Sequence, residues 1–333
     1  MSQRVTHSDL AAHAVDKVNI SSEAAKKRRT QVNHLRNRLE NYIAEHPDYK
    51  LVKMRSSGSV AKHTAIRSSR GPGSDADVAA YVRASAVGGV DVDEAGLLVW
   101  LLDRCKEVYG ATKVADDFVI SHHAVGITLH GSNLKIDVAP VLYEDEPDDR
   151  GHLITRQGDR VLTSVTQHLT FLNSRKTKAG AEYKELIRLF KAFIDRAKYE
   201  DHTFRFKSFL AELIVAHLWD NGWNGQALAV NDYPKAFEQL LGYIARTGLR
   251  EPIAFADYYK VDQVATSYDP VQVWDPVNEA NNVASSYSEL DRQRLVARAT
   301  GALEEVTWAA MAPTKGAAVE AWRTLFGPSF QGA

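Results

Sequence analysis

The hydrophobic pattern of the chain changes near residue 166, and this change constrains the fold more than any other feature. Between residues 51 and 165 the apolar residues come in short runs bounded by Gly, Asn, Ser and Asp, which is typical of β-strands. After residue 166 the pattern is helical almost throughout. The chain has 333 residues, enough for about two domains. We therefore expect a mixed α/β lobe over residues 1–165 and an all-helical lobe over residues 166–333.

The first lobe contains five strand-like runs, which are LVKMRSS, DADVAAYV, FVISHH, VGITLH and NLKIDVAPVLY. Segment 129–135, LHGSNLK, has the composition of a hairpin turn. A long helix is predicted from Ser21 or Ser22 to about Glu45, and a second helix within 90–110. In the second lobe no strand pair is expected, and DPVNEANNVA, from Asp275, is predicted to be a loop before the final helices.

Charge limits the function classes. The chain carries 41 Lys and Arg against 42 Asp and Glu, a formal net charge of −1. No global basic field would hold nucleic acid irrespective of sequence, so no strong nucleic-acid binding is expected. The basic cluster 26–29 is interpreted as a solvated helix face, with a nucleic-acid contact as the alternative.

Cysteine usage and hydropathy bear on location. The single cysteine, Cys105, excludes an intramolecular disulfide and a multi-cysteine metal site, which favours a reducing compartment and a packing role. The first thirty residues lack the apolar stretch of a secretory signal, and the longest apolar run is the eight residues AGLLVWLL at 95–102. We expect a cytoplasmic protein without a membrane span.

Two aspartates enter an otherwise apolar strand in SDADVAAYV. Because alternate side chains of a strand share a face, Asp75 and Asp77 project together, with Cα atoms about 6.5–7 Å apart. Strands normally exclude Asp, so this pair costs stability unless it binds a cation or solvent. Asp137 is a third acid within an apolar run, LKIDVAPVLY, that is expected in the same sheet.

Three carboxylates without His or Cys companions favour a hard cation such as Mg²⁺, with Mn²⁺ as the expected substitute. Two such ions, about 3.5–4 Å apart, would activate an attacking hydroxyl and stabilise the leaving pyrophosphate. The chemistry that the acids predict is nucleotidyl transfer at a two-metal site.

Gly58 and Ser59 follow the run LVKMRSS and open a short helix-like stretch, VAKHTAI. Backbone N–H groups and a hydroxyl at a helix start hold phosphate, although Gly-Ser also forms plain turns. The motif gains specificity from the D-x-D about sixteen residues later and from Asp137 beyond it. The chain has no Gly-Lys dipeptide and lacks H-E-x-x-H, G-x-G-x-x-G and G-x-S-x-G, so kinase, dehydrogenase and serine-hydrolase functions lose support.

The order Gly-Ser, acid-x-acid, third Asp resembles the signature of the polymerase-β-like nucleotidyltransferase superfamily. More narrowly, GSVAKHTAI, SDADVAAYV and KIDVAPV resemble the bacterial cGAS/DncV-like nucleotidyltransferases (CD-NTases) of CBASS anti-phage systems. In the second lobe LIRLFKAFI, FKSFLAELIVAHLW and DPVNEANNVA resemble the partner domain shared with oligoadenylate synthetases. The resemblance covers roughly residues 20–327.

The resemblance implies a bilobal α+β fold, with a nucleotidyltransferase lobe around a mixed sheet, an all-helical oligoadenylate-synthetase-like lobe, and the active site in the cleft between them. The metal-binding and catalytic residues that it implies are Asp75, Asp77 and Asp137. The nucleotide-binding residues that it implies are Gly58, Ser59, Lys191 and Ser208. Lys191 has apolar neighbours, so its ammonium either reaches solvent or is aimed at an anion, and Lys207 is the alternative to Ser208.

The implied reaction joins ATP and other NTPs into a cyclic di- or trinucleotide second messenger in bacterial anti-phage defence, releasing pyrophosphate at each step. Asp137 is expected to accept the proton of the attacking hydroxyl. Some CD-NTases with a small-residue C-terminus are conjugated by ubiquitin-transfer-like CBASS partners, and the ending at Ala333 is compatible with this, with a frayed end as the alternative.

Two other functions stay open. A linear nucleotidyltransferase acting on RNA ends or a small acceptor predicts a large basic groove, which the near-neutral charge does not favour. A catalytically silent nucleotide-binding scaffold would usually have lost one metal carboxylate, whereas all three are present in this chain.

Overall fold

A computed structural model describes residues 4–45, 49–67, 74–83, 96–144 and 147–332. Contacts between residues divide the chain into two compact units. The sheet unit comprises Ile20–His63 and Gly71–Thr170, and the helical unit comprises Met1–Asn19, Thr64–Arg70 and Phe171–Ala333. The fold is α+β, with a mixed sheet in the first unit and helices in the second, as the sequence predicts.

The strands of the sheet unit are β1 (Lys50–Ser57), β2 (Ser74–Arg83), β3 (Phe118–Ile120), β4 (Val125–Leu129), β5 (Leu134–Tyr143), β6 (Arg150–Ile154) and β7 (Arg160–Ser164). Their order is β1-β2-β5-β4-β3, with β6 paired to β5 and β7 paired to β6. β2 and β5 are parallel, and the other neighbouring strands are antiparallel. All five predicted runs form strands here, and β4 and β5 form the predicted hairpin.

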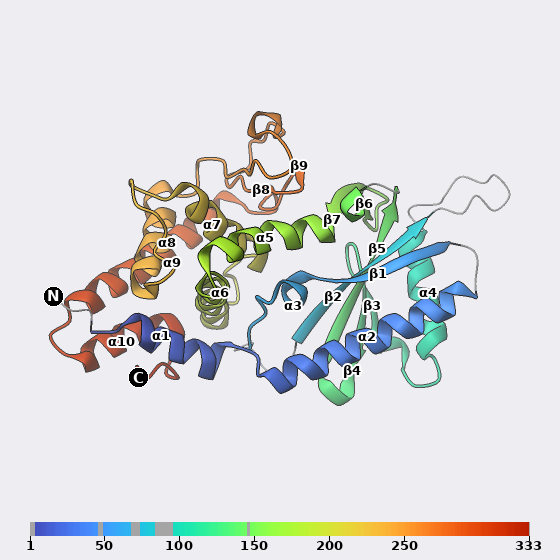
Figure 1. Cartoon of the computed structure of the whole chain (residues 1–333), viewed down its shortest axis with the longest axis horizontal. Coiled ribbons are helices and arrows are strands. Elements are labelled where there is room, and N and C mark those ends of the chain that lie inside the picture. The colour runs from blue at the N-terminus through green and yellow to red at the C-terminus, as the bar shows by residue number, and fades with distance from the viewer. Residues whose placement is uncertain (1–3, 46–48, 68–73, 84–95, 145–146, 333) are drawn as a thin grey trace. The chain divides into compact units, whose positions relative to one another are not determined.

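Two helices pack against one face of this sheet (Figure 1). α2 (Ser22–Ala44) begins after Ser21, whose hydroxyl accepts a hydrogen bond from the backbone N–H of Ala24 and so caps the helix. α4 (Leu97–Tyr109) lies beside α2 and buries Cys105, the packing role expected of this residue. The core residues of α2 are those that the helical spacing predicts, namely Val32, Leu35, Leu39 and Ile43.

Strand alternation puts the acidic residues of β2 on the opposite face of the sheet, where Ala79 and Tyr81, further along the strand, are buried in a separate apolar cluster. On β2 the side chains of Ala76, Val78 and Ala80 are buried in the core that α2 and α4 share. Because neighbouring residues of a strand point to opposite faces, Asp75 and Asp77 project from the other face. The two helices therefore leave the acidic positions uncovered by this core.

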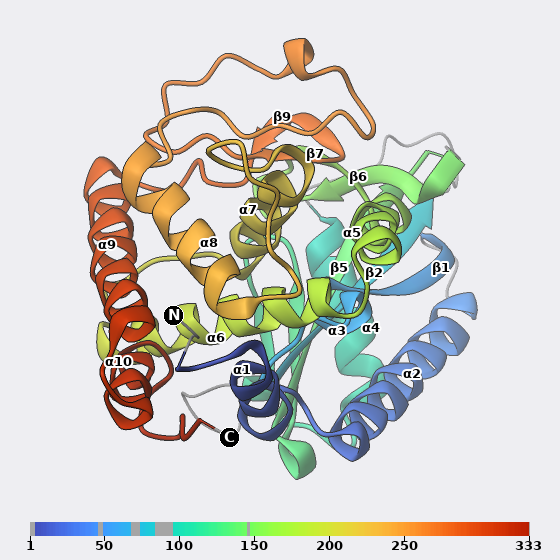
Figure 2. The same ribbon diagram turned by 60° about the vertical axis from the view of Figure 1, so that its left-hand side comes forward.

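The helices assigned mainly to the helical unit are α1 (His7–His13), α5 (Val165–Ala179), α6 (Glu182–Glu200), α7 (Ser208–Asn221), α8 (Tyr233–Thr247), α9 (Glu289–Met311) and α10 (Lys315–Phe326). Figure 2 shows α9 running alongside α8 and α10. Large aromatic side chains, Phe190, Phe237 and Trp322 among them, fill the core between these helices.

The first residues of the chain belong to the helical unit, whereas the sequence predicts a single boundary after residue 165. Leu10, Ala14 and Val18 follow one another at four-residue intervals from α1 into the π-helical turn Ala14–Val18, and all three are buried in the helical core. The side chain of Asn19 donates a hydrogen bond to Glu185 of α6 at 2.8 Å. These contacts tie the N-terminal segment to helices far along the chain.

The prediction that no strand pair follows residue 166 is wrong. β8 (Trp274–Asp275) and β9 (Asn278–Asn282) form an antiparallel pair within the segment predicted to be a loop. Polar side chains hold this hairpin through the backbone: Oδ1 of Asp275 accepts from the N–H of Val277, and Oδ1 of Asn282 accepts from those of Val273 and Ala284. The pair lacks apolar alternation, so its sequence shows no strand pattern.

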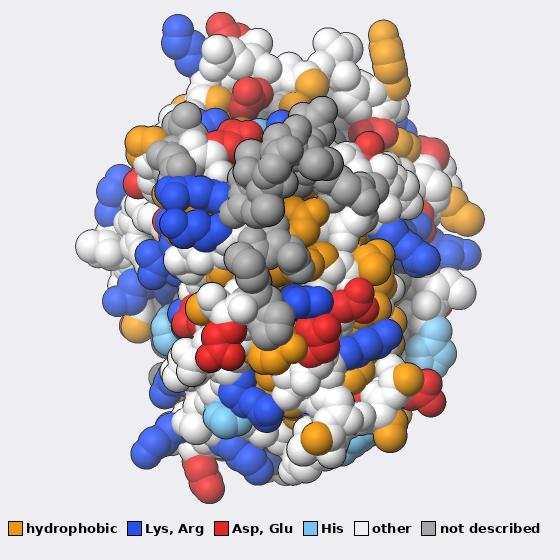
Figure 3. Space-filling model, turned by 90° about the vertical axis from the view of Figure 1, so that its right-hand side faces the viewer, with side chains coloured by type: hydrophobic (Ala, Val, Ile, Leu, Met, Phe, Trp, Pro, Cys, Tyr) orange, Lys and Arg blue, Asp and Glu red, His pale blue; other side chains and the backbone are white. Residues whose placement is uncertain are grey.

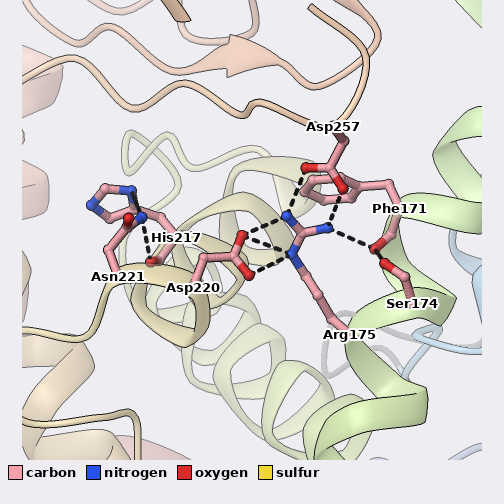
Figure 4. A network of polar contacts seen from close by, with 7 residues as sticks. All are labelled: Phe171, Ser174, Arg175, His217, Asp220, Asn221 and Asp257. Atoms are coloured by element: carbon pink, nitrogen blue, oxygen red, sulfur yellow. Dashed lines mark hydrogen bonds and ion pairs between the residues drawn. The ribbon is translucent and has the colours of Figure 1, made fainter. Parts of the chain in front are cut away.

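A buried arginine joins α5, α7 and the segment after α8 within the helical unit (Figure 4). Arg175 is 6% exposed and forms fork-like hydrogen bonds with Asp220 and Asp257, at 2.5–3.1 Å. Its Nη1 also donates to the carbonyl of Phe171 at 2.9 Å, and the guanidinium lies over the Phe171 ring. The network fixes the start of the long connection between α8 and β8.

The surface drawn in Figure 3 carries Lys and Arg side chains next to Asp and Glu side chains, in keeping with the near-zero net charge. Across the described ranges of the chain, no helix has both the length and the apolar character needed to cross a membrane.

Candidate active site

The register of two strands gathers the three aspartates. On the parallel pair β2 and β5, Asp77 lies opposite Asp137, and Asp75 lies opposite Lys135. Register partners on adjacent strands project from the same face, and so do residues two apart on one strand. Asp75, Asp77 and Asp137 therefore share the face of the sheet that α2 and α4 leave uncovered.

The electrostatics of this face centre on Asp77. Burial raises the pKa of the Asp77 carboxyl to about 6, and the negative charges of Asp137 and Asp75 add to this rise. The ammonium groups of Lys62 and Lys135 act in the opposite direction. A half-buried carboxylate beside two others is stabilised by any cation that approaches, so this face favours cation binding.

The Gly-Ser motif lies directly against Asp77. α3 (Gly58–Lys62) starts where β1 ends, and Ser57, the last residue of β1, is the register partner of Asp77. Gly58 has a φ of +63°, and a Cβ atom at this position would lie 1.8 Å from Oδ2 of Asp77. Only glycine fits here, both for backbone conformation and for space. The half-buried Ser59 follows at once, so the motif and the D-x-D meet in space.

Sequence reasoning did not single out two residues beside Asp137. The Lys135 ammonium lies 2.9 Å from Oδ1 of Asp137 and donates a hydrogen bond to Oδ2 at 3.2 Å. A Cβ atom on Gly126 of β4 would lie 2.7 Å from Cε of Lys135 and 2.9 Å from Oδ1 of Asp137. Lys135 lies two residues before Asp137, so strand alternation alone would have predicted that both side chains project from the same face.

The donor atoms of this face suit a divalent cation. They are carboxylate oxygens, the ligands that Mg²⁺ and Mn²⁺ prefer. Oδ1 of Asp137 is buried and accepts no hydrogen bond of regular geometry, although the Lys135 ammonium lies 2.9 Å from it as an ion pair. As the side chains stand, the described residues contain no group of three or more His, Cys, Asp or Glu side chains placed to hold one ion. The ligands are present on one face, and Lys135 contacts one of them.

The basic cluster at 26–29 contributes one residue near these acids. Arg28 of α2 is half-buried, whereas Lys26, Lys27 and Arg29 are exposed. Burial lowers the pKa of the Arg28 guanidinium, and the nearby Asp75 carboxylate opposes that shift. Most of the cluster is thus the solvated helix face that the sequence predicts.

The two predicted triphosphate contacts of the second lobe belong to the helical unit. Lys191 of α6 is 4% exposed, and its ammonium contacts Glu212 at 2.5 Å and the hydroxyl of Thr64 at 2.9 Å. Ser208 is exposed at the first position of α7. The ammonium of Lys207 donates to the carbonyl of Val283 at 2.7 Å. Lys191 is thus held in a buried ion pair, and Ser208 is open to solvent.

Comparison with known proteins places the chain among enzymes of one family, although no protein-family model matches it. It is 39% identical over 331 residues to a cyclic AMP-AMP-AMP synthase of Escherichia coli strain MS 115-1, covering 99% of both proteins. The chain belongs to the CD-NTase family of CBASS oligonucleotide cyclases. A second CD-NTase, the CBASS oligonucleotide cyclase CdnC of Escherichia coli strain KTE188, is 29% identical over 305 residues and 90% of each protein.

Solved structures agree with this membership. The structure of CdnC from E. coli MS115-1 with ATP has a TM-score of 0.85 and 39% identity, over 99% of this chain and 100% of that one. DncV of Vibrio cholerae, a cyclic AMP-GMP synthase, has a TM-score of 0.73 at 12% identity, over 99% of this chain and 97% of that one, and supports the fold alone. This CD-NTase is therefore a nucleotidyltransferase that makes a cyclic oligonucleotide second messenger in anti-phage defence.

Proposed function

We propose that this CD-NTase joins three molecules of ATP into a cyclic AMP trimer and releases one pyrophosphate for each bond formed. The choice of product is supported by the relative that is named for cyclic AMP-AMP-AMP and that matches the whole chain. The choice of ATP is supported by the CdnC structure determined with that nucleotide. The observation that carries the proposed site is the pairing of Asp77 with Asp137 across β2 and β5, with Gly58 against Asp77.

In the proposed mechanism Asp75, Asp77 and Asp137 would hold two Mg²⁺ ions, which would supply charge stabilisation for the triphosphate and for the attacking oxygen. Asp137 accepts the proton of the attacking 2′- or 3′-hydroxyl. Gly58 leaves room for the Asp77 carboxylate, and Ser59 binds a phosphate oxygen through its hydroxyl. Mn²⁺ is the expected substitute for Mg²⁺.

Lys191 and Ser208 stay in this proposal as triphosphate contacts from the helical unit. Ser208 is exposed, as a phosphate contact must be. To bind the triphosphate, Lys191 would have to give up its contacts with Glu212 and Thr64. The buried ion pair with Glu212 therefore disfavours a role of Lys191 in triphosphate binding. Of the two, Ser208 is therefore the better-supported contact.

The test is mass spectrometry of the product formed by the purified protein from ATP and Mg²⁺, with the other NTPs offered in parallel. We expect a phosphatase-resistant cyclic AMP trimer and pyrophosphate. Asp77→Asn should abolish the product, because it removes a charged ligand from the acidic face. Asp103→Asn, at an exposed acid on α4 in the same unit, is the matched control and should leave product formation unchanged.

Two results would contradict the proposal. Products that phosphatase degrades completely would indicate linear transfer, the alternative that the sequence left open. A full yield of the cyclic product from Asp77→Asn would show that the acidic face is not the site of catalysis.

We further propose a CBASS partner protein, because the E. coli MS115-1 CdnC relative has been solved in a complex named CdnC:HORMA-deltaN. Binding of purified HORMA protein in size-exclusion chromatography tests this partner. Cytoplasmic location stays a prediction from the lone cysteine. Conjugation at Ala333 also stays a prediction, since Ala333 lies outside the described residues. Phe330, three residues before it, is fully buried.

A further inference from the structure

Lys135 contacts the acid that the proposed mechanism uses most directly. It lies two residues before Asp137 on β5, and its ammonium is 2.9 Å from Oδ1 and 3.2 Å from Oδ2 of that carboxylate. In the register of the sheet it is the partner of Asp75. One lysine thus lies opposite one of the three acids and in contact with another.

The backbone of the neighbouring strand leaves room for this pair. At Gly126 a Cβ atom would come within 2.7 Å of Cε of Lys135 and within 2.9 Å of Oδ1 of Asp137, both closer than normal contact. Gly126 is the register partner of Asp137 on β4. An alanine here would push against both members of the ion pair, so the glycine suits the lysine as well as the acid.

The positive charge of Lys135 affects how strongly this face binds a cation. Asp75, Asp77 and Asp137 share one face, so their carboxylates repel one another and attract any cation. The Lys135 ammonium already neutralises part of this charge at Asp137. A divalent ion that takes an oxygen of Asp137 competes with the ammonium for the same lone pairs.

An ordinary ion pair in this chain provides the contrast. Lys235 and Glu238 on α8 are also 2.9 Å apart, but both side chains are more than a third exposed, at 37% and 48%. Such surface pairs contribute little. In the Lys135 pair the lysine is just as exposed, at 42%, but the Asp137 side chain is only 24% exposed and lies opposite the half-buried Asp77. The difference between the two pairs is therefore the acidic face beside the Lys135 ammonium.

We infer that Lys135 is a built-in counter-ion of the catalytic acids, which holds Asp137 before a divalent cation binds and leaves that carboxylate when it does. The inference rests on the proposed metal-binding role of the three aspartates. Lys135 is then a positioning residue. Its ammonium lowers the affinity of this face for cations, and it reduces the repulsion among the three carboxylates when no metal is bound. Gly126 provides the space in which the lysine lies.

The test measures Mn²⁺ affinity of the full-length, metal-stripped protein from the electron paramagnetic resonance signal of free Mn²⁺. Lys135→Gln removes the charge at similar length and should lower the Kd for Mn²⁺ by roughly threefold to tenfold. Lys135→Arg keeps the charge and should stay within about twofold of the unchanged protein. Lys235→Gln, which breaks the surface pair of equal length, is the matched control and should not alter the Kd.

Thermal unfolding gives a second readout without turnover. In EDTA, Lys135→Gln should unfold at a lower temperature than the unchanged protein, because the acids lose their counter-ion. Saturating Mn²⁺ should then raise its Tm by more than it raises that of the unchanged protein. If Lys135→Gln does not fold, Lys135→Met repeats both measurements with an uncharged chain of similar length.

An unchanged or weaker Mn²⁺ affinity in the uncharged variants would overturn the inference. Asp77→Asn separates this failure from a failure of the metal site itself. If the unchanged protein binds Mn²⁺ and Asp77→Asn does not, while Lys135→Gln binds as the unchanged protein does, only the role of Lys135 is wrong. If Asp77→Asn removes no Mn²⁺ binding, the proposed metal site is wrong, and the inference falls with it.

Discussion

At the scale of single residues, Gly58 shows how little room the candidate active site leaves. Its positive φ and the closeness of Asp77 Oδ2 exclude a side chain for two independent reasons. A change of one methyl group here would move the carboxylate, the backbone of α3, or both. The glycine of the Gly-Ser motif is thus required by packing against the acid as well as by any contact with phosphate.

We predict that Gly58→Ala lowers the rate of cyclic product formation by at least about 100-fold, because small displacements of reacting groups cost about that much. The same change should destabilise the fold by about 1–3 kcal/mol through backbone strain. Gly131→Ala is the control, since a Cβ atom there meets no atom within 4 Å. Product assays and urea unfolding of both variants check the prediction, and equal activity of the two would contradict it.

A second residue, His13, links stability to pH. Its side chain is 7% exposed, and its ring lies 5.0 Å from that of Phe326 and 5.1 Å from that of Phe330. Burial lowers the pKa of His13 from 6.5 to about 4; the charge of Lys17 adds to this shift and that of Asp16 opposes it. The folded chain therefore keeps the ring neutral at a pH where the unfolded chain binds a proton.

Because the unfolded state binds more protons between pH 6.5 and 4, His13 makes the fold less stable as the pH falls through this window. Between pH 7.5 and pH 5 this costs about 2 kcal/mol, from a shift of about 1.4 kcal/mol per pKa unit. We predict that His13→Phe removes this part of the pH dependence in urea unfolding. His202→Phe, at an exposed histidine, should leave the pH dependence as it is.

At the scale of elements, the Arg175 network anchors the long connection between α8 and β8. Segment 249–272, between α8 and β8, has little regular structure of its own, yet Asp257 within it is bonded to Arg175 of α5. Asp220 of α7 completes the fork, and the ring of Phe171 covers the guanidinium. One arginine thus joins three parts of the helical unit.

Arg175→Met should destabilise the protein by about 2–4 kcal/mol, because it leaves two partly buried carboxylates without their partner. The connection around Asp257 should also become the first site of limited proteolysis. Lys235→Gln serves as control and should change stability by less than about 0.5 kcal/mol. Calorimetry measures the stability and protease digestion the exposure of the connection. Similar stability and cleavage of Arg175→Met and Lys235→Gln would show that the network does not stabilise this connection.

At the scale of the whole molecule, each unit is built from separated stretches of chain. The helical unit takes its first helix from the N-terminus and the short stretch at 64–70 from the middle of the nucleotidyltransferase motifs. Thr64 of that stretch is buried, and its hydroxyl donates to Glu212 at 2.7 Å while accepting from Lys191. Thr64, which lies between the Gly-Ser and D-x-D motifs in the sequence, is therefore held by side chains of the helical unit.

We predict that Leu10→Ala destabilises the helical unit by about 3 kcal/mol, although Leu10 lies more than 150 residues before the other α-helices of that unit. Val15→Ala, five residues later at a side chain that is 63% exposed, should have little effect. Urea unfolding followed by tryptophan fluorescence distinguishes the two. Equal stability of the variants would mean that the N-terminal helix does not belong to this core.

The local features of this protein could be predicted from its amino-acid pattern. The helix of α2, the five runs that became strands, and the shared face of Asp75 and Asp77 all follow from periodicities of two or about 3.6 residues, which neighbours along the chain set. The family resemblance added the order of the motifs and the activity. None of these patterns contains information on which strand lies beside which.

The folded chain was needed to show that Asp77 pairs with Asp137, that Gly58 packs against the Asp77 carboxylate, and that Lys135 and Gly126 lie beside Asp137. It also shows that the N-terminal helix joins the helical unit and that β8 and β9 pair through polar side chains. These features depend on strand register and packing, which are set by contacts between residues far apart in the chain. A local pattern is compatible with several registers, and the other contacts of the fold select one of them.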